Sequence, residues 1–212
     1  KESSPGSGAW SVEATLTEHS SIVYCVAVLA EGRFVTGSGD GTMKVWKEIS
    51  PRSGEWSVEK NLQGHSGAVL CVAVLAEGRF VTGSQDKTVK VWKENEGGIP
   101  GDWTATQFTE HTNNVNCVAV LADGHFVTGS GDNTVKVWKE NTPGSGEWSI
   151  STFVGHSSYV YCVAVLADGR FVTGGADKTV KVWKENMPGS DDWIVEKTLK
   201  KTLKGDTEHS GG

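Results

Sequence analysis

The chain contains one 22-residue segment four times, with few changes between copies. The second copy reads CVAVLAEGRFVTGSQDKTVKVW over residues 71–92, and the others begin at Cys25, Cys117 and Cys162. Sixteen of the 22 positions are identical in all four copies. A unit this small cannot bury its own apolar face and becomes stable by stacking on its neighbours. The repeat therefore predicts one continuous array of four stacked units over residues 9–199.

Each unit contains four segments with the pattern of β-strands. In the second unit the first three are 68–75, 79–84 and 88–93, and a fourth such as 148–153 follows a loop containing Gly and Pro. The first segment is apolar on both faces, which is typical of a strand covered on both sides, whereas the fourth is apolar on one face only. Short strands separated by strong turn signals predict an all-β fold, and four such antiparallel strands fit one blade of a propeller.

The composition disfavours several classes of partner. The net charge is −6 and the basic residues are dispersed, so nucleic acid is not expected as a partner. No apolar stretch approaches the roughly 20 residues that span a membrane, so no membrane partner is expected. The first ten residues do not resemble a signal peptide, which favours a cytoplasmic location. Residues 1–8 are expected to be flexible, and residues 200–212 to form a disordered tail that resembles a truncated repeat.

The four cysteines occupy the same position in each copy. Metal sites and disulfides need cysteines that lie close together, whereas equivalent points on successive units are expected to be too far apart to bridge. We interpret Cys25, Cys71, Cys117 and Cys162 as small buried apolar residues, and a ring of thiols facing a central channel is the alternative. The sequence predicts no metal site and no cofactor.

The chain resembles the WD40 repeat family over about residues 10–199. The resemblance rests on Gly64-His65 and Gly155-His156, on the strand pattern VxCVAVLAxG, and on TGSxDxTxKVW in the first three copies. Two features depart from the family pattern. Lys follows the repeat Trp where the family has Asp, and Glu precedes His in the first and third copies. The resemblance implies a β-propeller, four blades per chain, and a non-enzymatic function in binding proteins or peptides.

The resemblance also implies one hydrogen-bonded set of side chains in each blade. In this set the Trp indole contacts a hydroxyl, the hydroxyl contacts His, and the imidazole contacts Asp. Either a Thr or the Ser two residues later supplies the hydroxyl, and the fourth copy has Gly175 at the Ser position. The expected members are His19, Thr36, Asp40, Trp46, His65, Thr82, Asp86, Trp92, His111, Thr128, Asp132, Trp138, His156, Thr173, Asp177 and Trp183.

Catalysis is not expected from this set. A Ser-His-Asp triad needs one exposed nucleophile beside an oxyanion hole, whereas these residues recur in every copy beside a Trp expected to be buried. We interpret them as a structural network. His125 and His209 have no matching partners in the sequence and are expected to be exposed.

The freer differences between copies form two groups, one just before the repeat Cys and one around the turn Asp. Both groups lie at the same end of an antiparallel blade, which predicts one shared binding face. Tyr and Asn suit contact surfaces because they combine apolar area with hydrogen bonding. Neutral drift at exposed positions is the alternative explanation. The candidate binding residues are Ile22, Tyr24, Leu70, Gln85, Lys87, Asn114, Asn116, Asn133, Tyr159, Tyr161 and Lys178.

A Trp begins each fourth strand, at Trp10, Trp56, Trp103, Trp148 and Trp193. Packing at the edge of the blade is favoured over a ring of aromatic sugar-binding sites. The chain has four copies of strands one to three but five of the fourth, because segments 10–16 and 193–199 both qualify. In this fold the N-terminal copy normally completes the last blade. We expect two chains to pair as a homodimer into a ring of eight blades, with a four-bladed monomer and a fragment of a longer chain as alternatives.

Three functions remain open from the sequence. The first is an interaction scaffold with several related sites on one face. The second is a designed or recently amplified structural propeller without an evolved ligand. The third is a lectin-like carbohydrate binder that uses the Trp residues.

Overall fold

The structure is a computed structural model that describes residues 8, 10–95 and 102–200. Its sixteen strands form four antiparallel sheets of four strands each, in chain order, so the predicted all-β fold with four blades is confirmed. Blade 1 contains β1 (Val23–Val28), β2 (Arg33–Ser38), β3 (Met43–Glu48) and β4 (Trp56–Leu62). Blade 2 contains β5 (Val69–Val74), β6 (Phe80–Ser84), β7 (Val89–Glu94) and β8 (Trp103–Phe108). Blade 3 contains β9 (Val115–Val120), β10 (Phe126–Ser130), β11 (Thr134–Glu140) and β12 (Trp148–Val154). Blade 4 contains β13 (Val160–Val165), β14 (Phe171–Gly175), β15 (Thr179–Glu185) and β16 (Trp193–Lys200).

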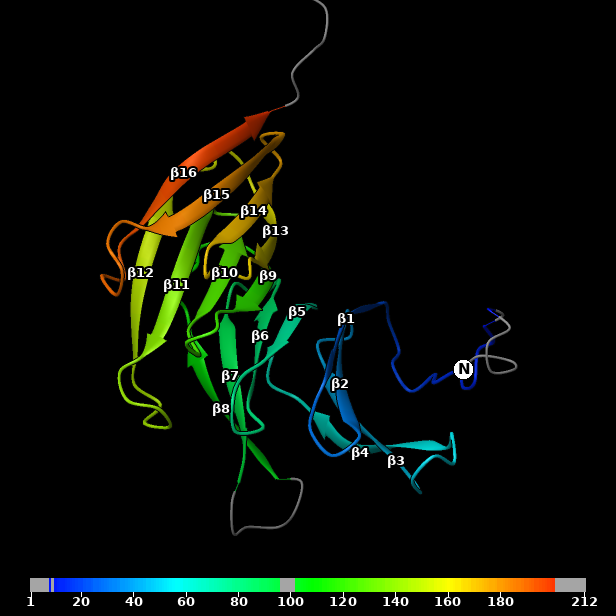
Figure 1. Ribbon diagram of the computed structural model, residues 1–212. Coiled ribbons are helices and arrows are strands. Elements are labelled where there is room, and N and C mark those ends of the chain that lie inside the picture. The colour runs from blue at the N-terminus through cyan, green and yellow to red at the C-terminus, as the bar shows by residue number, and fades with distance from the viewer. Residues whose placement is uncertain (1–7, 9, 96–101, 201–212) are drawn as a thin grey trace, which may run out of the picture.

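The blades follow one another in an open succession (Figure 1). The inner strands pack in order, β1 on β5, β5 on β9 and β9 on β13, while β13 does not return to pack on β1. Blade 1, in blue and cyan, and blade 4, in orange and red, therefore stand at opposite ends of the array. Each of these blades has one sheet face without a neighbouring blade.

The hydrophobic core is divided into three clusters, one between each pair of successive blades. In the first cluster Val35 and Met43 of blade 1 pack against Phe80, Trp92 and Trp103 of blade 2. We call the face that a blade turns to the next blade its trailing face, and the face that it turns to the preceding blade its leading face. Because the strands are apolar on both faces, every inner blade buries both faces, as the sequence pattern predicts.

Neighbouring blades approach closely at one glycine of the second strand in blades 1, 2 and 3. A Cβ atom at Gly83 would lie 2.5 Å from Cγ1 of Val115 in the next blade, a distance that no side chain tolerates. Gly37 and Gly129 have matching valines, at 2.7 and 2.6 Å. Glycine at this position therefore allows the first strand of the next blade to seat directly on the sheet.

Of the two candidate outer strands at the ends of the chain, only the C-terminal one forms a strand that completes a blade. Residues 10–16 match β4 in sequence pattern, yet they form no strand beyond an isolated bridge at Trp10, whose side chain is 78% exposed. The outer edge of blade 4 is already occupied by β16, which pairs with β15 as far as Lys200, so no edge remains for the N-terminal segment. The predicted flexible residues 1–7 and tail residues 201–212 lie outside the described residues.

The cysteines divide by position in the array. Cys71 and Cys117 are buried and Cys25 is partly buried, as expected for small apolar residues, but Cys162 is exposed. The prediction for Cys162 was wrong because, among the described residues, no further blade packs on the trailing face of blade 4. All four are free thiols.

Candidate functional site

The two groups of variable positions meet at one end of every blade, and we call this end the rim. In each blade the first turn residue donates its backbone N–H to the carbonyl group of the residue three positions before the Cys. The four bonds are Gly39 to Ile22, Gln85 to Ala68, Gly131 to Asn114 and Ala176 to Tyr159, at 2.8 to 2.9 Å. The candidate binding residues of each blade are thus held together by main-chain bonds that do not depend on their side chains.

The third turn residue has a positive φ in all four blades, between 63° and 78°. This residue is Gly41, Lys87, Asn133 or Lys178, and only Gly and Asn adopt that conformation with little strain. The backbone therefore restricts the variation at this position, a constraint that the comparison of copies did not reveal.

Exposure along the rim is uneven. Ile22 is 63% exposed, and Tyr24, Tyr159 and Tyr161 are 47–56% exposed. The Tyr159 and Tyr161 rings are nearly perpendicular, with centroids 6.3 Å apart. Gln85, Lys87 and Lys178 are also exposed, whereas Leu70, Asn114, Asn116 and Asn133 are half-buried.

One rim amide already has a partner within the array. Asn116 Nδ2 donates to the carbonyl oxygen of Val160 in the next blade at 2.8 Å. This amide joins blades 3 and 4 and is less available to a ligand than the tyrosines.

The side-chain network that the resemblance implied is present as hydrogen bonds in every blade. In blade 2, Trp92 Nε1 donates to Thr82 Oγ1 at 3.0 Å, Thr82 Oγ1 lies 2.8 Å from His65 Nε2, and His65 Nδ1 lies 2.9 Å from Asp86 Oδ2. The other three blades repeat these contacts at 2.7–3.0 Å. The hydroxyl always comes from Thr, so blade 4 keeps its network although Gly175 replaces the Ser.

The charge on Asp86 determines which atoms of this network carry the protons. Burial raises the pKa of that carboxyl, but hydrogen bonds from the Thr88 hydroxyl and backbone N–H and the nearby His65 outweigh burial and bring the pKa to about 2. An ionised carboxylate only accepts, so His65 Nδ1 donates to it and Nε2 accepts from Thr82. The pKa of His65 is lowered, chiefly by burial, which keeps the imidazole neutral. The Thr82 hydroxyl is fully buried and engaged in two hydrogen bonds, so it is not presented to a substrate.

A second Thr completes the network in each blade, and the sequence reasoning missed it. Thr88 Oγ1 donates to Asp86 Oδ1 at 2.6 Å, and the backbone N–H of Ser66 donates to Oδ2 at 2.9 Å. The signal was available, because a Thr follows the turn Asp by two residues in every copy. The other members are Thr42, Thr134 and Thr179.

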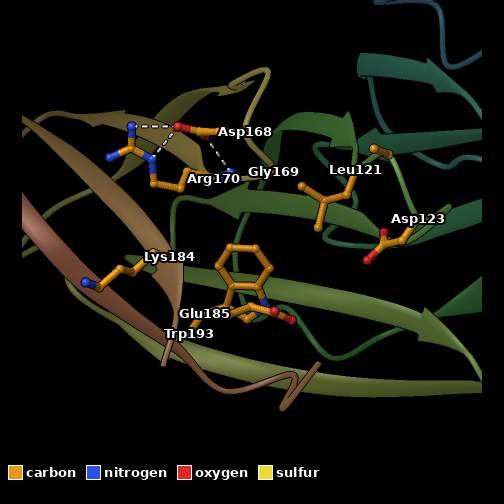
Figure 2. Close-up of a pocket in the computed structure, with 9 residues that line it drawn as sticks. Leu121, Asp123, Asp168, Gly169, Arg170, Lys184, Glu185 and Trp193 are labelled. Carbon is orange, nitrogen blue, oxygen red and sulfur yellow. Dashed lines mark hydrogen bonds and ion pairs between the residues drawn. The ribbon is translucent and has the colours of Figure 1, made fainter. Parts of the chain in front are cut away.

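A cavity of about 440 Å³ lies at the other end of blades 3 and 4 (Figure 2). Its lining residues are Leu121, Ala122, Asp123, Asp168, Gly169, Arg170, Lys184, Glu185 and Trp193. At the equivalent place between blades 2 and 3, Arg79 reaches across to Glu140 at 2.9 Å beside Trp148. Blade 3 has His125 at this position, and its Nδ1 lies 3.0 Å from Asp123 in its own blade. His125 is thus half-buried and paired, contrary to the prediction, and Glu185 lacks the arginine that its counterpart binds.

Within the described part of the chain, no group of three or more His, Cys, Asp and Glu side chains is placed to hold a metal ion. The same residues contain no helix long and apolar enough to cross a membrane.

A family model described as "WD domain, G-beta repeat" matches residues 10–47, 56–93, 103–139 and 147–184. The chain belongs to the WD40 repeat family. Among solved structures it is similar to the WD40 β-propeller domain of Doa1, with 32% identity and a TM-score of 0.61. The similarity covers 80% of this chain and 51% of that chain, so the WD40 chain described here corresponds to about half of its solved relative. No curated protein matches it.

Proposed function

We propose that this WD40 chain is a non-enzymatic scaffold that binds proteins or peptides through several related sites on the rim. One observation carries the proposal: between the residue three positions before the Cys and the repeat Trp, the freer differences between copies fall at the rim, and they include the exposed Tyr24, Tyr159 and Tyr161. The rest of the segment from Cys to Trp is nearly invariant and serves packing or the polar network, whereas the loops before the outer strands and the outer strands themselves also vary. A fixed frame with variable exposed residues is the pattern of a binding surface.

The chemistry of the rim favours extended peptides with apolar and acidic side chains. The perpendicular rings of Tyr159 and Tyr161 offer apolar area with two hydroxyl groups, and Lys178 is exposed on the adjacent turn. Large aromatic residues contribute most of the binding energy in many interfaces.

The test is a peptide array or pull-down with the full chain, followed by titration of each captured peptide. Tyr159→Ala should weaken binding by about tenfold, as expected for an aromatic anchor. Met187→Ala is the matched control, since Met187 is 64% exposed in the β15–β16 loop, away from the rim. An unchanged affinity for every captured partner would contradict the scaffold proposal and favour a structural propeller without a ligand.

The carbohydrate alternative has less support. The Trp residues that begin β4, β8, β12 and β16 pack against phenylalanines of their own blades, with ring centroids 4.8–5.1 Å apart. Trp103 and Trp193 are buried, so their faces are not open to a sugar. Binding on a glycan array that is lost with Trp56→Ala would reverse this preference.

We also propose that a second copy of the chain is a partner and that two chains form a ring of eight blades. The proposal is supported by the four blades per chain and by the unpaired sheet faces at both ends of the array. Sedimentation velocity should give twice the chain mass of 22.6 kDa.

A further inference from the structure

The two ends of the array are the separate halves of one interface that the chain makes three times internally. Val26 and Val28 on the leading face of blade 1 are 63% and 77% exposed, whereas Val72 and Val74 of blade 2 are packed against the core between blades 1 and 2. On the trailing face of blade 4, Val180 is 42% exposed, whereas its counterparts Met43, Val89 and Val135 are at most 1% exposed.

The valine-on-glycine contact identifies both missing partners. Three contacts exist, Val69 on Gly37, Val115 on Gly83 and Val160 on Gly129. The fourth glycine, Gly174, has only the Sγ atom of Cys162 within reach of a Cβ atom, and it lines an open hollow on the trailing face of blade 4. The fourth valine, Val23, is 50% exposed, while the other three are fully buried.

The ion pairs between blades, which lie at the end away from the rim, follow the same pattern. Arg33 of blade 1 pairs with Glu94 of blade 2 at 2.9 Å, and Arg79 of blade 2 pairs with Glu140 of blade 3 at the same distance. Among the residues that the structure describes, the last such arginine, Arg170, pairs within blade 4, with Asp168 and Glu196. The first such glutamate, Glu48, accepts backbone N–H groups of its own loop and contacts no arginine of another blade among the described residues.

The N-terminal segment leaves the inner part of this interface open and covers only its outer part. Residues 15–18 lie beside Trp46 and Trp56, as the end of β4 with Leu62 lies beside Trp92 and Trp103 in the next interface. The segment thus takes the place that the end of β16 of a second copy would take, so it has to move aside when the two copies pair, whereas Val23, Val26 and Val28 are already exposed.

We propose that the leading face of blade 1 binds the trailing face of blade 4 of a second copy, with Val23 seated on Gly174 and Glu48 paired with Arg170. This inference rests on the proposed pairing of two chains and specifies its contacts. We call this interface between two copies the seam. In a twofold dimer two seams form at once and no sheet face remains uncovered. Each seam repeats the burial of the internal interfaces and the ion pair that joins blades 1 and 2 and blades 2 and 3.

The first experiment tests separately whether two chains pair and whether they pair through the proposed contacts. Wild-type protein should sediment as a dimer, and Val23→Asp should sediment as a folded monomer, because residue 23 is half-exposed in a single chain but buried in the seam. Val154→Asp is the control, since Val154 is 79% exposed on blade 3, and it should remain dimeric. A monomeric wild type at all concentrations overturns both proposals, whereas a dimeric Val23→Asp protein overturns the contacts alone.

The second experiment uses charge reversal and does not depend on a buried residue. Arg170→Glu and Glu48→Arg should each weaken self-pairing at least tenfold, because each homodimer then has two like-charged seams. An equimolar mixture of the two variants should form heterodimers, since both seams then join opposite charges. No association on mixing would contradict the proposed contacts.

The thiol of Cys162 reports the seam directly. The other three cysteines should react slowly, since burial raises the pKa of Cys25 and of Cys117 to about 12 and that of Cys71 well above its ordinary value. In the dimer Cys162 should be protected from a thiol reagent, and dilution or Val23→Asp should expose it. Protection that persists in a monomer would mean that one chain closes on itself, and would overturn the proposal.

Discussion

At the residue scale, the fold of each blade depends on an aspartate that does not contact the hydrophobic core. Asp86 accepts from Thr88, Ser66 and His65, and so ties the turn before β7 to the segment that precedes β5. His65 and Thr82 then connect this charge to the indole of Trp92 inside the core. Each side chain has a hydrogen-bond partner, so the whole network stabilises the blade by more than the sum of its separate bonds.

This arrangement predicts a loss of stability in acid. The pKa of Asp86 is about 2 in the folded chain, below the ordinary Asp value of about 3.9, and the pKa values of Asp40, Asp132 and Asp177 are also lowered. The unfolded chain therefore binds more protons, so the free energy of unfolding should fall as pH decreases from about 5 toward 2.

The lowered pKa of His65 also makes the free energy of unfolding fall as pH decreases. Its contribution is complete above the unfolded value of about 6.5 and declines as pH falls below it. Urea unfolding between pH 7 and pH 2 measures both effects. Asp86→Asn should flatten the acid part of the profile, and an unaltered slope would contradict the assignment.

At the element scale, long side chains complete the interface between successive blades at the end away from the rim. Arg79 is 7% exposed and bridges blades 2 and 3, but His125 is too short to bridge blades 3 and 4 and turns to Asp123. The cavity in Figure 2 lies at this end of the same interface and is lined by Asp123 and Glu185. It is a packing difference between otherwise matching interfaces.

His125→Arg should therefore stabilise the chain. The new guanidinium group can pair with Glu185 and cover Trp193, as Arg79 pairs with Glu140 beside Trp148. A gain of about 1 kcal/mol is expected for a partly buried hydrogen-bonded ion pair. Urea unfolding provides the measurement, and Arg79→His is the reverse control, which should destabilise. A stabilising Arg79→His would show that the arginine does not hold the blades together.

At the scale of the whole molecule, stability should depend on concentration. The three internal interfaces are complete within one chain, but the outer faces of blades 1 and 4 are covered only in the proposed pair. A partner that binds only the folded chain raises its stability by mass action. The midpoint of thermal unfolding should rise with protein concentration for the wild type and stay constant for Val23→Asp. A concentration-independent wild type would count against pairing.

The repeat predicted the four blades, because these depend on local pattern and on contacts between equivalent units, whereas the members of the polar network were implied by the family resemblance. It did not decide between Thr82 and Ser84 as the hydroxyl, since alternate residues of a strand point to the same face. The repeat also did not predict the surroundings of residues at the two ends of the array. Residues 10–16 have the pattern of β4 but no free edge to pair with, and Cys162 has the surroundings of Cys71 in sequence but not in space. A strand and a buried thiol are both defined by neighbours that a repeat unit does not contain.

The valine seat on glycine has a consequence for how many chains assemble. The contact joins unlike faces, so nothing in its chemistry limits the assembly to two copies. The subunit number is set only by the angle through which each blade turns relative to the last. A change that flattened this angle would leave every contact intact and convert a closed ring into a larger ring or an open helical filament.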